Sequence, residues 1–161
     1  MYKAFISIFF LLVFSSFAQA QSSVPKVELF TGYSNLNSEF GNSLNGVTTS
    51  VSGQITKSVS AVADISFYSK NGSNATLLLF GPRYSIRTNS RFTPYFQALF
   101  GGVAPIGTFA MNFGGGIDYK VNKNISVRLI QADYVQLRNG NAALNNARIS
   151  TGIVFTFGNK E

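Results

Sequence analysis

The segment that ends in Phe157 most strongly limits what this chain can fold into, because its side chains alternate strictly between two kinds. One face of this segment would carry Ile149, Thr151, Ile153, Phe155 and Phe157, and the other face would carry Arg148, Ser150, Gly152, Val154 and Thr156. A period of two residues is typical of a β-strand with one apolar face. We therefore expect the chain to end in a strand that separates two different environments.

The same alternation recurs along the chain in segments of roughly ten residues, the length that a tilted strand needs to cross a bilayer. No segment after residue 20 keeps a helical period of 3.6, so no helix is expected there. The eight expected strands are Lys26–Leu36, Leu44–Thr56, Val59–Tyr68, Ala75–Arg87, Phe92–Val103, Thr108–Val121, Ile125–Leu137 and Ala147–Phe157.

The polar faces of these strands carry small neutral side chains such as Thr48, Ser50 and Ser52, with only isolated charges. Charged residues make up 12% of the chain, about half of their usual share in a soluble domain. A water-facing sheet surface would carry more Lys and Glu. We therefore expect an eight-stranded antiparallel up-and-down transmembrane β-barrel with a polar lumen and an apolar exterior. A soluble lipocalin-like, ligand-binding barrel with its apolar face inward stays open as the alternative.

The first twenty residues have the pattern of a secretory signal peptide. Lys3 is followed by the apolar run Ala4–Ala18, and Ala18-Gln19-Ala20 fits a small-x-small cleavage site. An uncleaved anchor helix is the alternative, but this run is shorter than the roughly 20 residues that span a bilayer. We expect residues 1–20 to be removed and residues 21–161 to form one barrel domain.

The expected connections alternate in character. Three are tight and basic, whereas four are mostly longer and rich in Asn, Gly and Ser, as expected for periplasmic turns and outer loops respectively. The first group is Lys57-Ser58, Thr88–Arg91 and Asn122–Asn124, and the second is Asn37–Ser43, Ser69–Asn74, Ala104–Gly107 and Arg138–Asn146.

Charged residues on the expected inward faces predict a network in the lumen. These residues are Glu28, Asp64, Arg83, Asp118 and Arg128. Buried charges are costly unless they are paired, and an eight-stranded barrel leaves little interior space. We expect Arg83 and Arg128 to bridge the three carboxylates. The network either holds the barrel closed or forms a gate for ions.

The seventh strand fits the alternation poorly. The register of Val127 and Leu129 would place Gln131 and Asp133 in lipid. Either a bulge near Gln131 returns Asp133 to the lumen, or Asp133 lies above the lipid near the outer rim.

Aromatic residues are expected to form belts at both membrane interfaces. The expected periplasmic belt contains Tyr84, Phe92, Tyr95, Tyr119, Phe155 and Phe157, and the expected outer belt contains Tyr33, Phe67, Phe100, Phe109 and Tyr134.

Several function classes are disfavoured by composition. The chain has no His and no Cys, which removes most nucleophilic and zinc chemistry, so we expect no enzyme activity, no catalytic residue, no metal site and no cofactor. The net charge is +7, but the basic residues are scattered, so nucleic-acid binding is not expected.

The combined motifs of residues 21–161 resemble small OmpA-like outer-membrane β-barrel proteins. The motifs are V-E-L-F-T-G-Y-S at Val27–Ser34, F-G-P-R-Y at Phe80–Tyr84, T-P-Y-F-Q-A-L-F-G-G at Thr93–Gly102, F-G-G-G-I-D at Phe113–Asp118 and V-R-L-I-Q-A-D-Y at Val127–Tyr134. The resemblance implies a monomer in the bacterial outer membrane, with a structural or surface-interaction role and a plugged lumen. A narrow channel for ions or small solutes is the alternative.

The resemblance also implies partners. Ser150, Gly152, Phe155 and Phe157 match the terminal signal by which the barrel assembly machinery recognises such chains. Periplasmic chaperones would accompany the chain during assembly, and outer-membrane lipid and lipopolysaccharide would surround the finished barrel. The tail Gly158–Glu161 departs from the family pattern, in which the chain often stops at the final aromatic residue.

Overall fold

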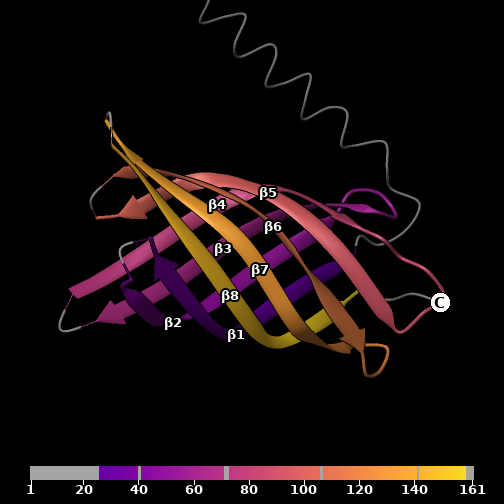
Figure 1. Ribbon diagram of the computed structural model, residues 1–161. Helices are drawn as coiled ribbons and strands as arrows, with labels where there is room; N and C mark the ends of the chain where they lie inside the picture. The colour runs from indigo at the N-terminus through magenta and orange to yellow at the C-terminus, as the bar shows by residue number, and fades with distance from the viewer. Residues whose placement is uncertain (1–25, 40, 71–72, 106, 141, 159–161) are drawn as a thin grey trace, which may run out of the picture.

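The computed structural model describes residues 26–39, 41–70, 73–105, 107–140 and 142–158, so the expected signal peptide lies outside the described residues. The described chain forms eight strands in a closed barrel, in which each strand is antiparallel to its neighbours and β1 pairs with β8 (Figure 1). The predicted fold is confirmed. The strands are β1 Val27–Ser38, β2 Ser43–Gln54, β3 Val59–Lys70, β4 Ser73–Ser85, β5 Phe92–Ala104, β6 Thr108–Lys120, β7 Ile125–Asn139 and β8 Ala142–Phe157.

The two faces of the barrel wall are inverted relative to a soluble protein. Large apolar side chains point outward, and Phe80 and Phe96 are 63% and 62% exposed. Small polar and charged side chains point into the lumen, where Arg128 and Arg148 are fully buried. An apolar exterior around a polar interior is the pattern of a barrel that spans a membrane. The soluble alternative, with its apolar face inward, is therefore wrong.

The connections differ from the expectation at the end of the barrel away from Val27 and Phe157, which we call the far end. We call the opposite end, where β1 begins and β8 ends, the terminal end. β8 begins at Ala142, five residues before the expected start, because β7 and β8 continue to pair up to Asn139 and Ala142. The far-end connections are therefore no longer than those at the terminal end, and the expected long outer loops are not present among the described residues.

A bulge in β7 resolves the ambiguous register of this strand. The pairing with β6 and with β8 shifts between Arg128 and Gln131, and the consecutive side chains of Leu129 and Ile130 both point outward, 49% and 47% exposed. One extra residue in a strand reverses the phase of everything after it. Asp133 consequently lies in the lumen and is 4% exposed, so a position at the outer rim is excluded.

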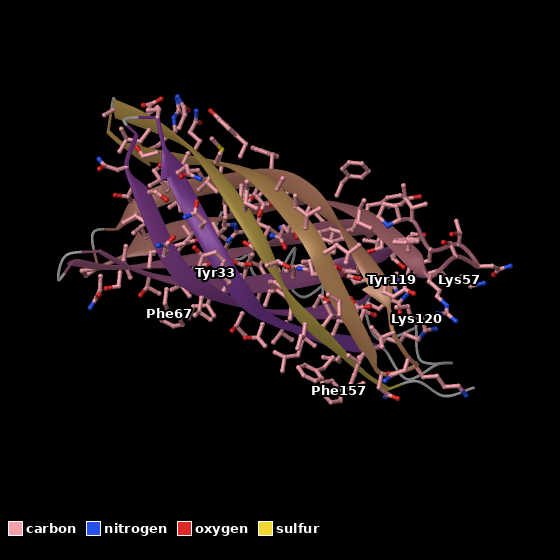
Figure 2. All side chains as sticks on the ribbon, turned by 60° about the horizontal axis from the view of Figure 1, so that its bottom comes forward. Tyr33, Lys57, Phe67, Tyr119, Lys120 and Phe157 are labelled. Carbon is pink, nitrogen blue, oxygen red and sulfur yellow. The ribbon has the colours of Figure 1, made fainter. Side chains whose placement is uncertain are left out.

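Exposed aromatic residues lie toward both ends of the barrel. Figure 2 shows Tyr33 and Phe67 toward the far end, and Tyr119 and Phe157 toward the terminal end. Tyr95 is an exception to the predicted belt, because its side chain is buried in the lumen and 1% exposed. No helix among the described residues is long and apolar enough to span a membrane.

Candidate functional site

The lumen is filled by two groups of side chains with different chemistry. The charged half lies toward the terminal end, and the apolar half lies toward the far end. The charged half consists of Asp64, Arg83, Tyr95, Gln97, Asp118, Arg128, Gln131, Asp133 and Arg148. The apolar half consists of Leu36, Tyr68, Leu77, Leu79, Leu99, Val103, Ala110 and Val135, and the same cluster continues along β3 to Val62, beside the charged half.

The first ion pair of the charged half joins β6 to β7. Arg128 donates from Nε to Oδ1 of Asp118 over 2.8 Å and from Nη2 to Oδ2 over 3.1 Å. Its guanidinium also lies 4.1 Å from the ring centre of Phe30 and 4.6 Å from that of Tyr95. Two parallel hydrogen bonds and two aromatic faces hold this cation in one position.

The second ionic cluster is a triad, in which Arg148 contacts two carboxylates. Its Nη1 lies 3.0 Å from Oδ1 of Asp64, and its Nη2 lies 2.8 Å from Oδ2 of Asp133. Ser66 and Thr48 donate further hydrogen bonds to Asp64. The triad therefore joins β3, β7 and β8 across the interior of the barrel.

Two glutamines connect the ion pairs into one network. Gln131 accepts from Nη1 of Arg128 over 2.7 Å and donates to Oδ2 of Asp133 over 2.6 Å. Gln97 donates to Oδ1 of Asp133 over 3.3 Å and accepts from Nη2 of Arg83 over 2.8 Å. A continuous set of hydrogen bonds thus runs from Asp118 to Asp64 through the centre of the lumen.

The glycine run of β6 makes room for this network. A Cβ atom on Gly114 would lie 2.2 Å from Oδ1 of Asp133, and one on Gly116 would lie 2.7 Å from the hydroxyl of Tyr95. Glycine inside a strand often marks such a close approach. The sequence run that the strand pattern alone leaves unexplained is therefore part of the charged half.

The structure distributes the five expected network residues differently from the prediction. Arg83 makes no ion pair among the described residues: it donates to Gln97 and lies 4.5 Å from the ring centre of Tyr95. Asp64 pairs with Arg148, and Glu28 pairs with Arg87 at 2.8 Å near the terminal end. The expected bridges from Arg83 to carboxylates are thus not found in the described chain.

Two central residues, Arg148 and Asp133, were missing from the expected network. Arg148 lies on the inward face of the last strand, so the alternation of side chains could have identified it as a lumen residue. Asp133 could be assigned only once the bulge at Leu129 and Ile130 was placed. The expected lumen of small polar residues is also incomplete, because its far portion is apolar.

The apolar half closes the lumen without charge. Leu99 and Val135 are fully buried, and Leu77 is 3% exposed. Three polar groups lie among them: the hydroxyl of Tyr68 hydrogen-bonds to Ser34, the amide of Asn146 donates to the carbonyl of Val135, and the amide of Asn112 has no hydrogen-bond partner among the described residues. Asn112 is paired in register with Leu99 on one side and Val135 on the other. Apolar side chains therefore fill most of this portion of the described lumen, with few polar groups between them.

The four expected assembly-signal residues occupy different environments on β8. Ser150 is buried and donates to Oγ of Ser34 over 2.9 Å. Gly152 lies opposite Gly32, where a Cβ would come within 2.5 Å of the partner Cα. Phe155 is half-buried, and Phe157 points outward and is 54% exposed.

The solved structures that resemble this chain agree on the fold. No family model matches the chain, and no curated protein matches it. Neisserial surface protein A is 16% identical with a TM-score of 0.64, covering 84% of this chain and 98% of that one. The N-terminal barrel domain of Pseudomonas aeruginosa OprF is 16% identical with a TM-score of 0.54, covering 82% and 97%.

A third similar structure is Ail, the attachment invasion locus protein of Yersinia pestis. It is 13% identical with a TM-score of 0.55, covering 83% of this chain and 99% of that one. The chain therefore has the eight-stranded fold of small OmpA-like outer-membrane barrels. At these identities the likeness establishes the fold and leaves the particular role open.

Proposed function

We propose that this protein is an integral outer-membrane β-barrel with a closed lumen and a structural or surface-interaction role. The observation that carries the proposal is that two sets of side chains fill the described lumen: a hydrogen-bonded network, and an apolar cluster that lies mostly toward the far end. Since apolar side chains fill most of the far part of the described lumen, passage of ions would require that cluster to move. The apolar exterior supports the location in a membrane.

The second candidate is a narrow channel, and the charged half favours it because such groups can exchange partners. Conductance of the purified mature chain in a planar bilayer separates the two functions. A closed barrel gives no steady conductance above that of the bare membrane. A reproducible single-channel current would contradict the closed lumen and favour the channel.

A surface role would be carried by neutral side chains at the far end. Amides on the outward faces of β1, β2, β7 and β8 form what we call the amide patch, consisting of Asn35, Asn37, Asn45, Gln136 and Asn145. Tyr33 donates to Asn45 over 2.7 Å, which connects this patch to the far aromatic belt. The patch presents uncharged hydrogen-bonding groups, a chemistry suited to the hydroxyl groups of neutral sugars.

Ail offers a contrast for this surface, because it was crystallised in complex with the heparin analogue sucrose octasulfate. A sulfated ligand requires a concentration of cations. The described strands place two basic residues at the far rim, Lys70 at the end of β3 and Arg138 near the end of β7, and neither belongs to the amide patch. We therefore propose a neutral saccharide ligand for the amide patch. Glycan-array binding of the refolded protein, compared with an Asn35→Ala/Asn45→Ala variant, tests that choice.

The location is tested by gel mobility of the outer-membrane fraction with and without boiling. We expect the signal peptide to be removed after Ala20 and the folded barrel to migrate differently from the boiled chain, as a detergent-resistant monomer. A soluble protein with unchanged mobility would contradict both the membrane location and the barrel.

The terminal signal is tested by two variants with matched exposure. Phe157 and Phe92 both point outward, 54% and 49% exposed, at the same end of the barrel. If Phe157 serves recognition by the assembly machinery, Phe157→Ala lowers the amount of folded barrel in the outer membrane several-fold more than Phe92→Ala. Equal amounts of the two variants would remove support for the signal. Refolding of both purified variants in detergent controls for stability.

A further inference from the structure

A polar cavity opens at the terminal end of the barrel, below the charged half. It has a volume of about 80 Å³, several times the space that one water molecule needs. Its wall is built by strand ends and turns from β1, β4, β5, β6, β7 and β8. The lining residues are Lys26, Glu28, Ser85, Arg87, Thr93, Asp118, Lys120, Lys123, Ser126, Val154 and Thr156.

The charges around this cavity do not balance. Four of the lining residues are basic, namely Lys26, Arg87, Lys120 and Lys123. The two carboxylates of the lining are already bound by arginines, since Glu28 accepts from Arg87 and Asp118 accepts from Arg128. The excess of positive charge in the lining therefore rests on Lys26 and Lys120, which neither of these two ion pairs uses.

Hydroxyl groups complete the lining. Ser85, Thr93, Ser126 and Thr156 stand between the basic residues around the cavity. Hydroxyls and cationic amines together are donors for an oxyanion, whose several oxygens accept hydrogen bonds in different directions. The lining offers less to an apolar ligand or a cation, because Val154 is its one apolar side chain and both of its carboxylates are paired with arginines.

We propose that the cavity at the terminal end binds a phosphate group. The group belongs either to free phosphate in the compartment that this end faces or to the headgroup of an anionic lipid at the barrel edge. The chemistry is the same in both cases. This binding site goes beyond the proposed function, because it depends on neither a surface ligand nor a conducting lumen.

The surroundings of the cavity favour an anion as well. Lys57 lies in the connection between β2 and β3 and Arg91 in that between β4 and β5, and Figure 2 shows Lys57, Tyr119 and Lys120 gathered at this end. Arg91 hydrogen-bonds to the hydroxyl of Tyr119 at 3.4 Å, and this bond raises its pKa above the ordinary value. A set of cations at one end of a barrel attracts anions over distances comparable to the Debye length.

The test is calorimetric titration of the mature chain, refolded in a non-ionic detergent, with inorganic phosphate at constant ionic strength. Chloride is titrated as the reference anion. A parallel titration uses a short-chain phosphatidylglycerol, with the zwitterionic phosphatidylcholine of the same chain length as its reference. The variants are Lys120→Gln, whose side chain lines the cavity, and Lys57→Gln, which removes the same charge from the same end outside the lining.

We expect saturable binding of phosphate, weakened about tenfold by Lys120→Gln (about 1.4 kcal/mol) and less than about twofold by Lys57→Gln. Binding of phosphatidylglycerol alone, with the same dependence on Lys120, would also support the site and identify lipid as the source. Equal weakening by both variants would overturn the proposal in favour of general charge attraction. Binding of neither probe would overturn it as well. If Lys120→Gln fails to fold, Lys26→Gln replaces it.

Discussion

The two halves of the lumen close the same barrel by different physics. In the charged half, Arg148 contacts two carboxylates at 2.8 and 3.0 Å, and every member depends on a partner from another strand. In the apolar half, Leu99 and its neighbours exclude water mainly by packing. A buried ion lowers the stability of the fold by several kcal/mol when its partner is removed. Deletion of a buried methyl group lowers the stability only by the loss of its own contacts and by the cavity that remains.

The two halves therefore have different roles. The charged half determines which arrangement of strands can form, and the apolar half closes the lumen to water. The charged half accepts only one arrangement of strands, since hydrogen-bond partners from β3, β5, β6, β7 and β8 must meet. The apolar half tolerates changes of shape more readily, because dispersion contacts have little directionality. Four variants test this comparison.

The largest effect is expected for Arg148→Met. The substitution leaves Asp64 and Asp133 buried without their common cation, which costs about 3–5 kcal/mol. The free energy of unfolding by urea in lipid vesicles measures the loss. Adding Asp64→Asn and Asp133→Asn to the same chain removes the stranded charges and is expected to restore most of the stability. Failure of this rescue would mean that charge is not the cause.

A smaller loss is expected for Leu99→Ala in the apolar half. Leu99 is fully buried, and deletion of such a side chain leaves an internal cavity that costs about 3 kcal/mol. The matched control is Leu78→Ala, because Leu78 points outward and lipid chains can fill the space it leaves. Equal losses for the two leucines would contradict a packed interior at this level.

Arg83→Met is expected to be milder than Arg148→Met, although both remove a buried guanidinium. Arg83 contacts Gln97 and the ring of Tyr95, so its loss strands an amide oxygen, at a cost of about 1–2 kcal/mol. The same urea titration compares the two variants directly. A loss for Arg83→Met as large as for Arg148→Met would show that Arg83 compensates carboxylates at longer range.

The smallest effect, and the one of opposite sign, is expected for Asn112→Leu. The amide of Asn112 has no hydrogen-bond partner among the described residues, although the side chain is fully buried. Leucine has the same branching at Cγ and no polar atom, so the substitution removes a desolvation penalty and is expected to stabilise the barrel by about 1 kcal/mol. Destabilisation would indicate that Asn112 belongs functionally to the charged half.

Much of the fold could be predicted because alternation is local. Seven of the eight strands begin within about two residues of their expected starts, since the period of two reports which face each side chain takes. The exception is β8, whose first residues Ala142–Asn146 contain Asn and Ala and read as a loop. Pairing with β7 makes them a strand, and pairing is not a local property.

The charged half shows where prediction from the sequence ended. Inward positions could be assigned for Asp64 and Arg128, but the choice of partners could not, because the tilt of the strands decides which inward residues meet. Arg148 reaches Asp64 from β8 across the interior to β3, a contact between residues far apart in sequence. Tyr95 likewise was expected at a membrane interface and lies between two guanidinium groups.

The sequence by itself determined the number of strands, the inverted arrangement of polar and apolar faces and the presence of buried charge, because each of these follows from side-chain chemistry at a period of two. Only the tertiary structure decided how the lumen is divided, which cation compensates which carboxylate and where a cavity remains at the terminal end. Those properties depend on closure, register and the bulge in β7, which position side chains from distant strands in one narrow space.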